Sequence, residues 1–167
     1  MRGSALACAL VWGLIVTGLV SGCGQSSERG DEWTLEQAKE FAQRGELEIA
    51  AAVPAAGVIR VDQRALGSLL SCRGDRNYQW AGGTGIDVVA SADLRGMLDA
   101  VAATFAQRDG WEVTRPADDD GTPEVYLDRG PLGGFVVSAW SDPTVVNIFS
   151  FSPCFHLPEG ESSRGLF

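Results

Sequence analysis

Residues 124–151 read EVYLDRGPLGGFVVSAWSDPTVVNIFSF, and the alternation of side chains within this stretch decides the fold class. Three of its segments follow the two-residue period of a β-strand: 125–127, 135–140 and 145–151. The segments between them, Gly130–Gly134 and Ser141–Pro143, have the composition of turns. A fourth alternating segment precedes them at 111–114. Four strands joined by short turns predict an antiparallel meander.

Two helices are predicted upstream of the meander. Thr34 and Gln37 form a capping box, and the helix that it opens is expected to stop before Pro54. Ser91 is the predicted cap of the second helix, and Gly110 its stop. Apolar residues recur at helical spacing in both segments: Leu35, Ala38, Phe41, Ala42, Ile49 and Val53, then Leu94, Met97, Leu98, Val101 and Phe105.

The region between the helices has a weaker pattern. Residues 57–62 are expected to be a short strand or an extended connection, and residues 64–70 one or two helical turns. Residues 77–90 are predicted to be one strand with a bulge, or two short strands, interrupted at Gly82–Gly85. Strands grouped apart from helices predict an α+β two-layer domain, with an antiparallel sheet of about four to five strands and two main helices packed on one face.

The N-terminus resembles a bacterial lipoprotein signal. Arg2 precedes an apolar stretch that ends in Ser21-Gly22-Cys23, and this stretch is shorter than the roughly 20 apolar residues of a membrane-spanning helix. The resemblance implies that residues 1–22 are a signal peptide and that Cys23 carries the lipid. The alternatives are a plain signal peptide cleaved near Gly22 and an uncleaved anchor. The lipoprotein interpretation predicts attachment to the extracytoplasmic face of the cell membrane.

The exported part divides by composition. Residues 23–32 are predicted to be a flexible tether, because Gly24–Glu32 carries no apolar side chain. Residues 33–157 are expected to form a single domain, and the polar residues 158–167 a flexible tail.

Charge excludes one class of partner. The chain has a net charge of −9, and removal of residues 1–22 takes away only one charge, that of Arg2. Nucleic acid is therefore not an expected partner, since its phosphates would be repelled. Anionic lipid head groups would be repelled as well, so the acyl chains have to hold the protein at the membrane.

Two cysteines remain in the exported part, Cys72 and Cys154. An exported chain meets a non-reducing space, and two cysteines allow one pairing, so a disulfide is predicted. The alternative is two separate buried thiols. No zinc site is expected, because four-ligand spacing is absent.

Catalytic, metal and cofactor sites are not predicted. His156 is the only histidine, and no nucleophile is marked out for it. The consecutive Asp118–Asp120 lacks the alternate spacing of a calcium loop and is interpreted as a turn. Trp80 and Trp140, together with Tyr78, weakly indicate a ligand-binding face, and ordinary packing is the alternative.

Several landmarks together resemble the small lipoproteins of actinobacteria, with the layout of the LppA-like group. They are the Cys23 signal, the polar tether, Cys72, the segment Phe105–Val113 and the closing Ser152–Phe155. The resemblance implies an anchored envelope domain with a disulfide and no catalytic residues.

The expected function is that of a non-enzymatic, membrane-anchored domain that binds an envelope protein or another envelope component. A small-ligand-binding lipoprotein is the first alternative, and a pocket of about 300 Å3 or more would favour it. A carboxylate-based envelope hydrolase is the second, and two carboxylates converging in a cleft would favour it.

Overall fold

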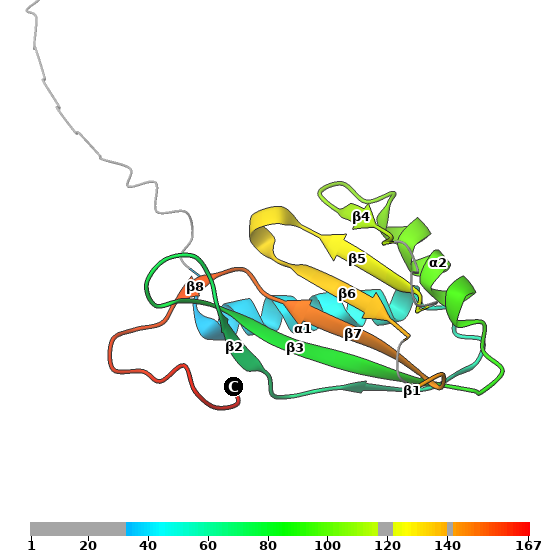
Figure 1. The fold of residues 1–167 in the computed structure, drawn as a ribbon, viewed down its shortest axis with the longest axis horizontal. Coiled ribbons are helices and arrows are strands. Elements are labelled where there is room, and N and C mark those ends of the chain that lie inside the picture. Colours follow the sequence, from blue (N-terminus) through cyan, green and yellow to red (C-terminus); the bar gives the residue numbers. More distant parts are fainter. Residues whose placement is uncertain (1–32, 117–121, 140–141) are drawn as a thin grey trace, which may run out of the picture. The chain divides into compact units, whose positions relative to one another are not determined.

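The computed structural model describes residues 33–116, 122–139 and 142–167. The predictions for the signal peptide, the tether with Cys23, the Asp118–Asp120 turn and Trp140 lie outside these residues. The described residues belong to one compact α+β unit, in which two α-helices accompany an antiparallel sheet (Figure 1). The predicted fold class is therefore confirmed in its coarse form.

The described part of the sheet has eight strands, in the order β1-β3-β7-β6-β5-β4, with β2 and β8 also paired to β3. The bounds of its strands are β1 Val58–Gln63, β2 Ser68–Ser71, β3 Asn77–Val88, β4 Glu112–Thr114, β5 Glu124–Asp128, β6 Gly134–Ser138, β7 Val145–Phe151 and β8 Phe155–His156. The helices are α1 Leu35–Ala52 and α2 Leu94–Phe105, with a 3-10 turn η1 at Gly130–Leu132.

The predicted number of four to five strands is wrong. The additional strands include β2 and β8, which are four and two residues long and form by pairing with β3. Segments this short carry little periodic signal of their own. The helical turns predicted at 64–70 are also wrong. Part of this segment belongs to β2, which places Leu69 opposite Trp80 in the sheet.

Of the two predicted alternatives for residues 77–90, the structure has the single strand: β3 runs through Gly82–Gly85 for 12 residues, and the predicted interruption there is absent. Its glycines allow close packing. A Cβ atom added at Gly82 would lie 1.9 Å from the Trp80 ring, and one added at Gly83 would lie 2.6 Å from the Ile148 carbonyl oxygen. A larger side chain therefore has no room at either position.

Helix α1 begins and ends as predicted. Thr34 Oγ1 accepts from the Gln37 backbone N–H while Gln37 Oε1 accepts from the Thr34 N–H, which is the reciprocal capping box. Gly45 lies in the middle of the helix, where a Cβ atom would be 2.3 Å from the Phe135 ring. This close approach brings α1 down onto the sheet.

Helix α2 has a different cap from the predicted one. Asp93, rather than Ser91, is the N-cap, since its carboxylate accepts from the Gly96 backbone N–H at 3.0 Å. The helix also ends earlier than predicted: its last residue is Phe105 and its C-cap is Ala106, while Gly110 lies in the turn that follows, with a φ of +78°. Within the described ranges, neither helix is long and apolar enough to cross a membrane.

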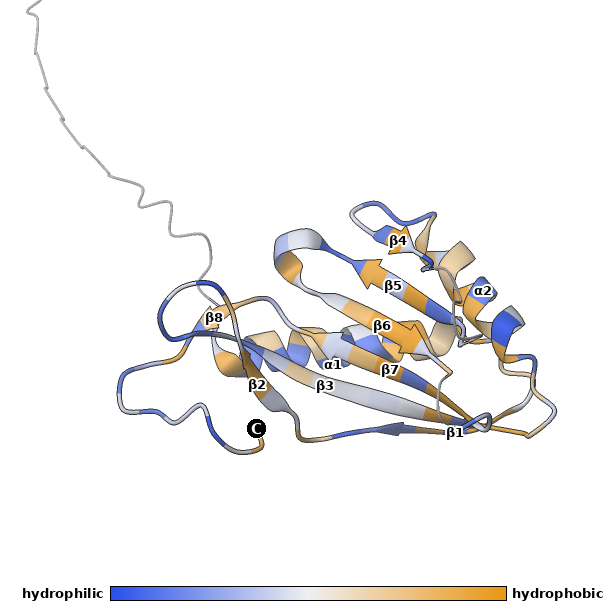
Figure 2. Ribbon diagram, in the orientation of Figure 1, coloured by the Kyte–Doolittle hydropathy of each residue, from blue (hydrophilic) through white to orange (hydrophobic). Residues whose placement is uncertain are grey.

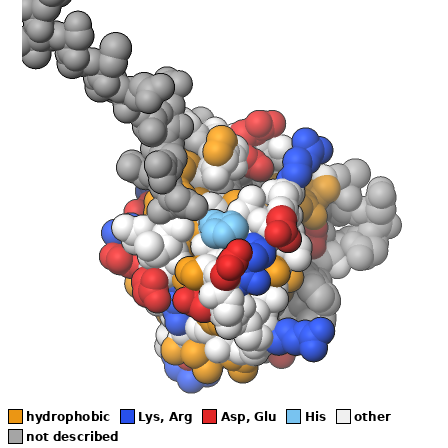
Figure 3. All heavy atoms as spheres, turned by 90° about the vertical axis from the view of Figure 1, so that its left-hand side faces the viewer, with side chains coloured by type: hydrophobic (Ala, Val, Ile, Leu, Met, Phe, Trp, Pro, Cys, Tyr) orange, Lys and Arg blue, Asp and Glu red, His pale blue; other side chains and the backbone are white. Residues whose placement is uncertain are grey.

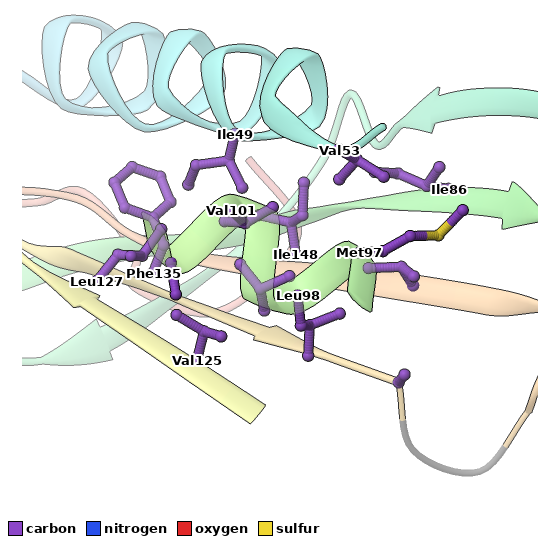
Figure 4. Packing of buried hydrophobic residues seen from close by; sticks show 14 of the residues in the cluster. Ile49, Val53, Ile86, Met97, Leu98, Val101, Val125, Leu127, Phe135 and Ile148 are labelled. Carbon is purple, nitrogen blue, oxygen red and sulfur yellow. The ribbon is translucent and has the colours of Figure 1, made fainter. Parts of the chain in front are cut away.

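The main core lies between the helices and one face of the sheet (Figure 4). Ile49 and Val53 come from α1, and Leu98 and Val101 come from α2. The strands β3, β5, β6 and β7 contribute alternate residues, and Figure 2 shows hydrophobic segments interspersed with polar ones along the meander. Their buried side chains are Ile86, Val88, Val125, Leu127, Phe135, Val137, Val146 and Ile148.

A second core cluster joins the first turns of α1 to β3 and β8. Its buried members are Ala38, Ala42, Trp80, Phe155 and Leu157. The segment 158–167, predicted to be flexible, is bonded to this end of the domain: Gly67 and Phe167 exchange two backbone hydrogen bonds of 2.9 Å. The pairing explains how a polar segment is held without a core of its own.

The predicted disulfide is confirmed. Cys72 and Cys154 are joined, with Cα atoms 6.3 Å apart and a sequence separation of 82 residues. Cys72 follows β2 and Cys154 precedes β8, and both strands pair with β3. The disulfide therefore links β2 and β8, which pair with opposite edges of β3 at the same end of that strand.

Replacement of both cysteines, Cys72→Ser with Cys154→Ser, should lower the free energy of unfolding by about 4–5 kcal/mol, because the open chain gains loop-closure entropy. Denaturant unfolding with and without reductant measures this loss. The variant should be insensitive to reductant, and reduction should weaken the native protein by a similar amount. A loss below about 1 kcal/mol would contradict this role for the bond.

Candidate functional site

The structure places the predicted tryptophan face inside the domain. Trp80 is fully buried, and its indole N–H donates to the Phe167 carbonyl at 3.1 Å. Tyr78 is half-buried and lies opposite Phe155 on the same side of the sheet. Both residues point toward α1, so they serve packing, and Trp140 lies outside the described residues.

Trp111 also packs within the domain. Its ring meets the Phe105 ring edge-on at 4.6 Å between centroids and lies 5.8 Å from the Phe135 ring. The Arg129 guanidinium stands 4.7 Å from the Trp111 ring centre. This cluster closes the end of the main core beneath α2 and is not a free aromatic surface.

His156 lies at the end of the domain where α1 begins. It is exposed, and its Nδ1 lies 3.3 Å from the Asn77 side-chain oxygen. Figure 3 looks onto this end, where acidic and basic side chains surround the histidine. A hollow of about 490 Å3 opens here, lined in part by Trp33, Leu35 and Leu157.

A buried carboxylate that was not predicted from the sequence lies between α1 and the sheet. Glu46 is fully buried. Its Oε2 accepts from Thr84 Oγ1 at 2.7 Å and from Gln63 Nε2 at 2.8 Å, and its Oε1 accepts from Ser150 Oγ. The donors come from β3, β1 and β7, so one side chain bonds α1 to three strands.

Both carboxylate oxygens of Glu46 accept hydrogen bonds, so this side chain is a structural link between α1 and the sheet. The signal for it was present in the sequence, since Glu46 continues the spacing of Ala38 and Ala42 along the buried face of α1. A charged residue in an apolar helical stripe needs partners on the facing element. Thr84 and Ser150 supply them from adjacent strands.

The sheet face turned away from the helices is the candidate functional surface. The cross-strand register places a set of apolar and aromatic side chains there, and we call them the open face. They are Tyr126, Val136, Val145, Phe149 and Phe151. Within the described residues no helix packs on this side, and Figure 1 shows the strands in front of α1.

A groove of about 480 Å3 lies at one end of the open face. Tyr126, Val136 and Phe151 line it, together with Gln79 and the hairpin glycines around η1. Gly133 has a φ of +88°, and a Cβ atom there would lie 2.1 Å from the Phe151 carbonyl oxygen. The groove is therefore shaped by a glycine that no other residue can replace without strain.

The open face is acidic. Glu112, Glu124 and Asp128 flank it, and strands β4 to β7 contain no lysine or arginine. The Tyr126 hydroxyl donates to Glu124 at 3.0 Å, and this bond with the carboxylate charge raises the pKa of Tyr126. An apolar strip bordered by carboxylates favours a partner that carries apolar and basic groups.

The described residues bring no metal set together: no group of three His, Cys, Asp or Glu in those ranges is placed to hold an ion. Glu46 has hydroxyl and amide partners, and Cys72 and Cys154 are used by the disulfide.

Comparison with known proteins gives one structural similarity. No protein-family model matches the chain, and no curated protein matches it. Among solved structures, the chain is similar to the crystal structure of a DUF4853 family protein from Actinomyces odontolyticus ATCC 17982. The two share 15% identity with a TM-score of 0.49, over 77% of this chain and 71% of that chain. The resemblance to actinobacterial lipoproteins stays a prediction.

Replacement of the buried carboxylate tests its structural role. Glu46→Ala should lower the free energy of unfolding by about 3–5 kcal/mol, because Gln63, Thr84 and Ser150 lose their acceptor inside the domain. Glu46→Gln keeps an acceptor oxygen and should cost about 1–2 kcal/mol. Denaturant unfolding measures both.

The matched control is Glu48→Gln on the same helix. Glu48 is half-exposed and ion-paired to Arg108, so its loss should stay within about 0.5 kcal/mol. Equal effects at positions 46 and 48 would show that the buried bonds do not stabilise the fold.

Proposed function

We propose that the chain is a lipid-anchored, extracytoplasmic domain that binds a protein of the cell envelope and is not an enzyme. The bound segment lies on the open face and brings apolar and basic side chains to it. The observation that carries the proposal is the aromatic and acidic sheet surface, on which no helix of the described residues packs, with its groove of about 480 Å3.

The anchor is supported by the N-terminal pattern and by the disulfide. Arg2, the apolar stretch and Ser21-Gly22-Cys23 form the three parts of an export signal with a lipid-bearing cysteine. The Cys72–Cys154 bond is of a kind that persists in non-reducing spaces outside the cytoplasm. A lipid on Cys23 and a disulfide in the domain are both consistent with a location outside the cytoplasm.

Binding on the open face is supported by its composition. Tyr126 is 41% exposed, and Val136 and Phe151 are half-buried in the groove wall. Contiguous apolar surface with a polar rim is typical of interaction sites. The carboxylates of Glu124 and Asp128 border it, so a neutral or acidic partner would leave their charge unmatched.

A binding role, rather than catalysis, is supported by the way reactive groups are used. Both cysteines form the disulfide, and the His156 ring contacts the Asn77 amide. Glu46 accepts three hydrogen bonds that join α1 to the sheet. Each of these groups has a structural partner.

The resemblance to LppA-like lipoproteins of actinobacteria is consistent with this proposal, since it implies an anchored envelope domain with one disulfide. It rests on the Cys23 signal, the polar tether, Cys72, the segment Phe105–Val113 and the closing Ser152–Phe155.

A small-ligand-binding lipoprotein is the alternative function. The hollow of about 490 Å3 beside His156 favours it, because its volume exceeds the lower range of small-molecule sites. Trp33, Leu35 and Leu157 give its wall an apolar part, and Glu36 and Glu161 give it charge.

Loss of the lipid should release the protein. Cys23→Ser should move the chain from the membrane pellet to the soluble extracytoplasmic fraction, because a signal-cleaved chain without acyl groups has no anchor. Cell fractionation with immunoblotting measures this. Cys8→Ser, within the apolar signal stretch, is the control and should stay in the pellet. Retention of signal-cleaved Cys23→Ser protein in the membrane would contradict the anchor.

A photo-crosslinking amino acid in place of Val136 tests the binding face in intact cells. We expect a defined protein adduct from position 136, because this side chain lies in the groove wall. Gln107, exposed just beyond α2 on the helix side, is the matched control and should give none. Adding Asp128→Lys to the position-136 probe should reduce the adduct, since it removes acidic charge from the face.

Equal adducts from positions 136 and 107, or an adduct indifferent to Asp128→Lys, would contradict a charge-selective open face. A small molecule retained by the purified protein in native mass spectrometry, with no protein adduct, would favour the alternative function.

A further inference from the structure

Large apolar side chains are exposed along one edge of the sheet. Strand β1 is the last strand at its end of the sheet order and forms the lower edge in Figure 1. Ile59 and Val61 on this strand are 66% and 43% exposed, and Leu66, just after it, is 54% exposed. With Leu47 of α1 we call them the β1 edge surface. They make up four of the eight large hydrophobic residues exposed in the described ranges.

Leu47 belongs to this surface because its side of α1 faces β1. Gln43, one turn earlier, donates to the Arg64 carbonyl at 3.2 Å, and its own carbonyl accepts from Gln63 Nε2 at 2.7 Å. Val61 lies opposite Ile86 in the register and so points to the helix side of the sheet. The apolar surface therefore extends from the strand edge to the helix layer.

Among the described strands, β1 pairs with β3 alone, so one edge of its backbone has no strand beside it in those ranges. The Arg64 N–H donates to the Gly83 carbonyl of β3 at 3.1 Å. In an antiparallel ladder alternate residues face the same partner, so Asp62 turns its backbone groups toward β3 while Val61 and Gln63 turn theirs outward. An outward row of N–H and C=O groups is a template for another strand.

The charged side chains of β1 favour pairing with a strand of complementary charge. Arg60 and Asp62 flank Val61 and share the side of the sheet that faces away from the helices. The Arg60 guanidinium lies 3.0 Å from the Asp87 carboxylate and 3.6 Å from the Asp62 carboxylate, and both carboxylates are partly exposed. If a second β1 is turned by 180° about Val61, each Arg60 lies opposite Asp62 of the second copy. The Arg-Val-Asp order is thus complementary to itself in an antiparallel pair.

We infer that β1 pairs with β1 of a second copy of this chain, antiparallel and about a two-fold axis at Val61. The pair joins two sheets into one, covers the outward backbone groups and buries the β1 edge surface. The interface is isologous, so each copy offers the same residues. Charged side chains also protect edge strands from pairing, but here opposite charges alternate and meet their complements.

Cysteine crosslinking of the full chain, purified with its anchor in detergent, tests the inference. Val61→Cys should form an intermolecular disulfide, because directly opposed hydrogen-bonded residues have Cα atoms about 5.5 Å apart, within disulfide range. Leu70→Cys is the matched control: Leu70 is 42% exposed on β2, against 43% for Val61. Under mild oxidation on a non-reducing gel, Val61→Cys should give at least about tenfold more dimer than Leu70→Cys.

Charge reversal gives a second, independent readout by analytical ultracentrifugation. Asp62→Arg and Arg60→Asp should each weaken self-association about tenfold, since each places like charges opposite one another. Mixing the two variants should restore a heterodimer, because the Arg-rich and Asp-rich edges are complementary. Thermal melting followed by circular dichroism establishes that each variant is folded.

The cysteine experiment needs neither charge variant, so it decides the matter if Arg60→Asp does not fold. A monomeric native chain at micromolar concentration, or equal crosslinking at positions 61 and 70, would overturn the inference. Either of these results leaves the proposed binding on the open face untouched, because that face lies on other strands.

Discussion

The fold depends on one constraint, which is the continuity of β3 through its glycines. This strand of 12 residues pairs with β1 and β2 along one edge and with β7 and β8 along the other. The tight fit of Gly82 to the Trp80 ring and of Gly83 to the Ile148 carbonyl admits no side chain. Because β3 is continuous through these residues, the disulfide, the second core cluster and the meander all take their positions from it.

The two faces of the sheet have different roles. Glu46 fixes α1 to β1, β3 and β7 on one face, and α2 covers β5 on the same side. On the opposite face, Tyr126, Val136 and Phe151 line the groove. We interpret the helix layer as the stabilising side of the domain and the open face as its binding side, carried outside the cell on the Cys23 anchor that we propose.

Much of the fold could be predicted from local pattern, because the capping box at Thr34, the stripe of α2 and the alternation of the meander are each set by neighbouring residues. What failed depends on distant partners. Strand β2 exists because it pairs with β3, and the glycines of β3 were mistaken for a break because their packing partners lie on other elements. The residues of the candidate site were harder to predict from the sequence than the fold. The role of Glu46 depends on donors that lie 17, 38 and 104 residues away in the chain, and the burial of Trp80 depends on residues of α1 and β8 that its own strand does not reveal.

Amide hydrogen exchange of the central residues of β3 tests this account most directly. If β3 is one continuous strand between β1 and β7, the amides of Gly83, Thr84, Gly85 and Ile86 should exchange as slowly as those of β7 beside them, because both strands open only with the whole domain. Fast exchange confined to Gly83–Gly85, with slow exchange on either side, would mean that the glycines form a loop. The register that places the helices on one face and leaves the other open would then be wrong.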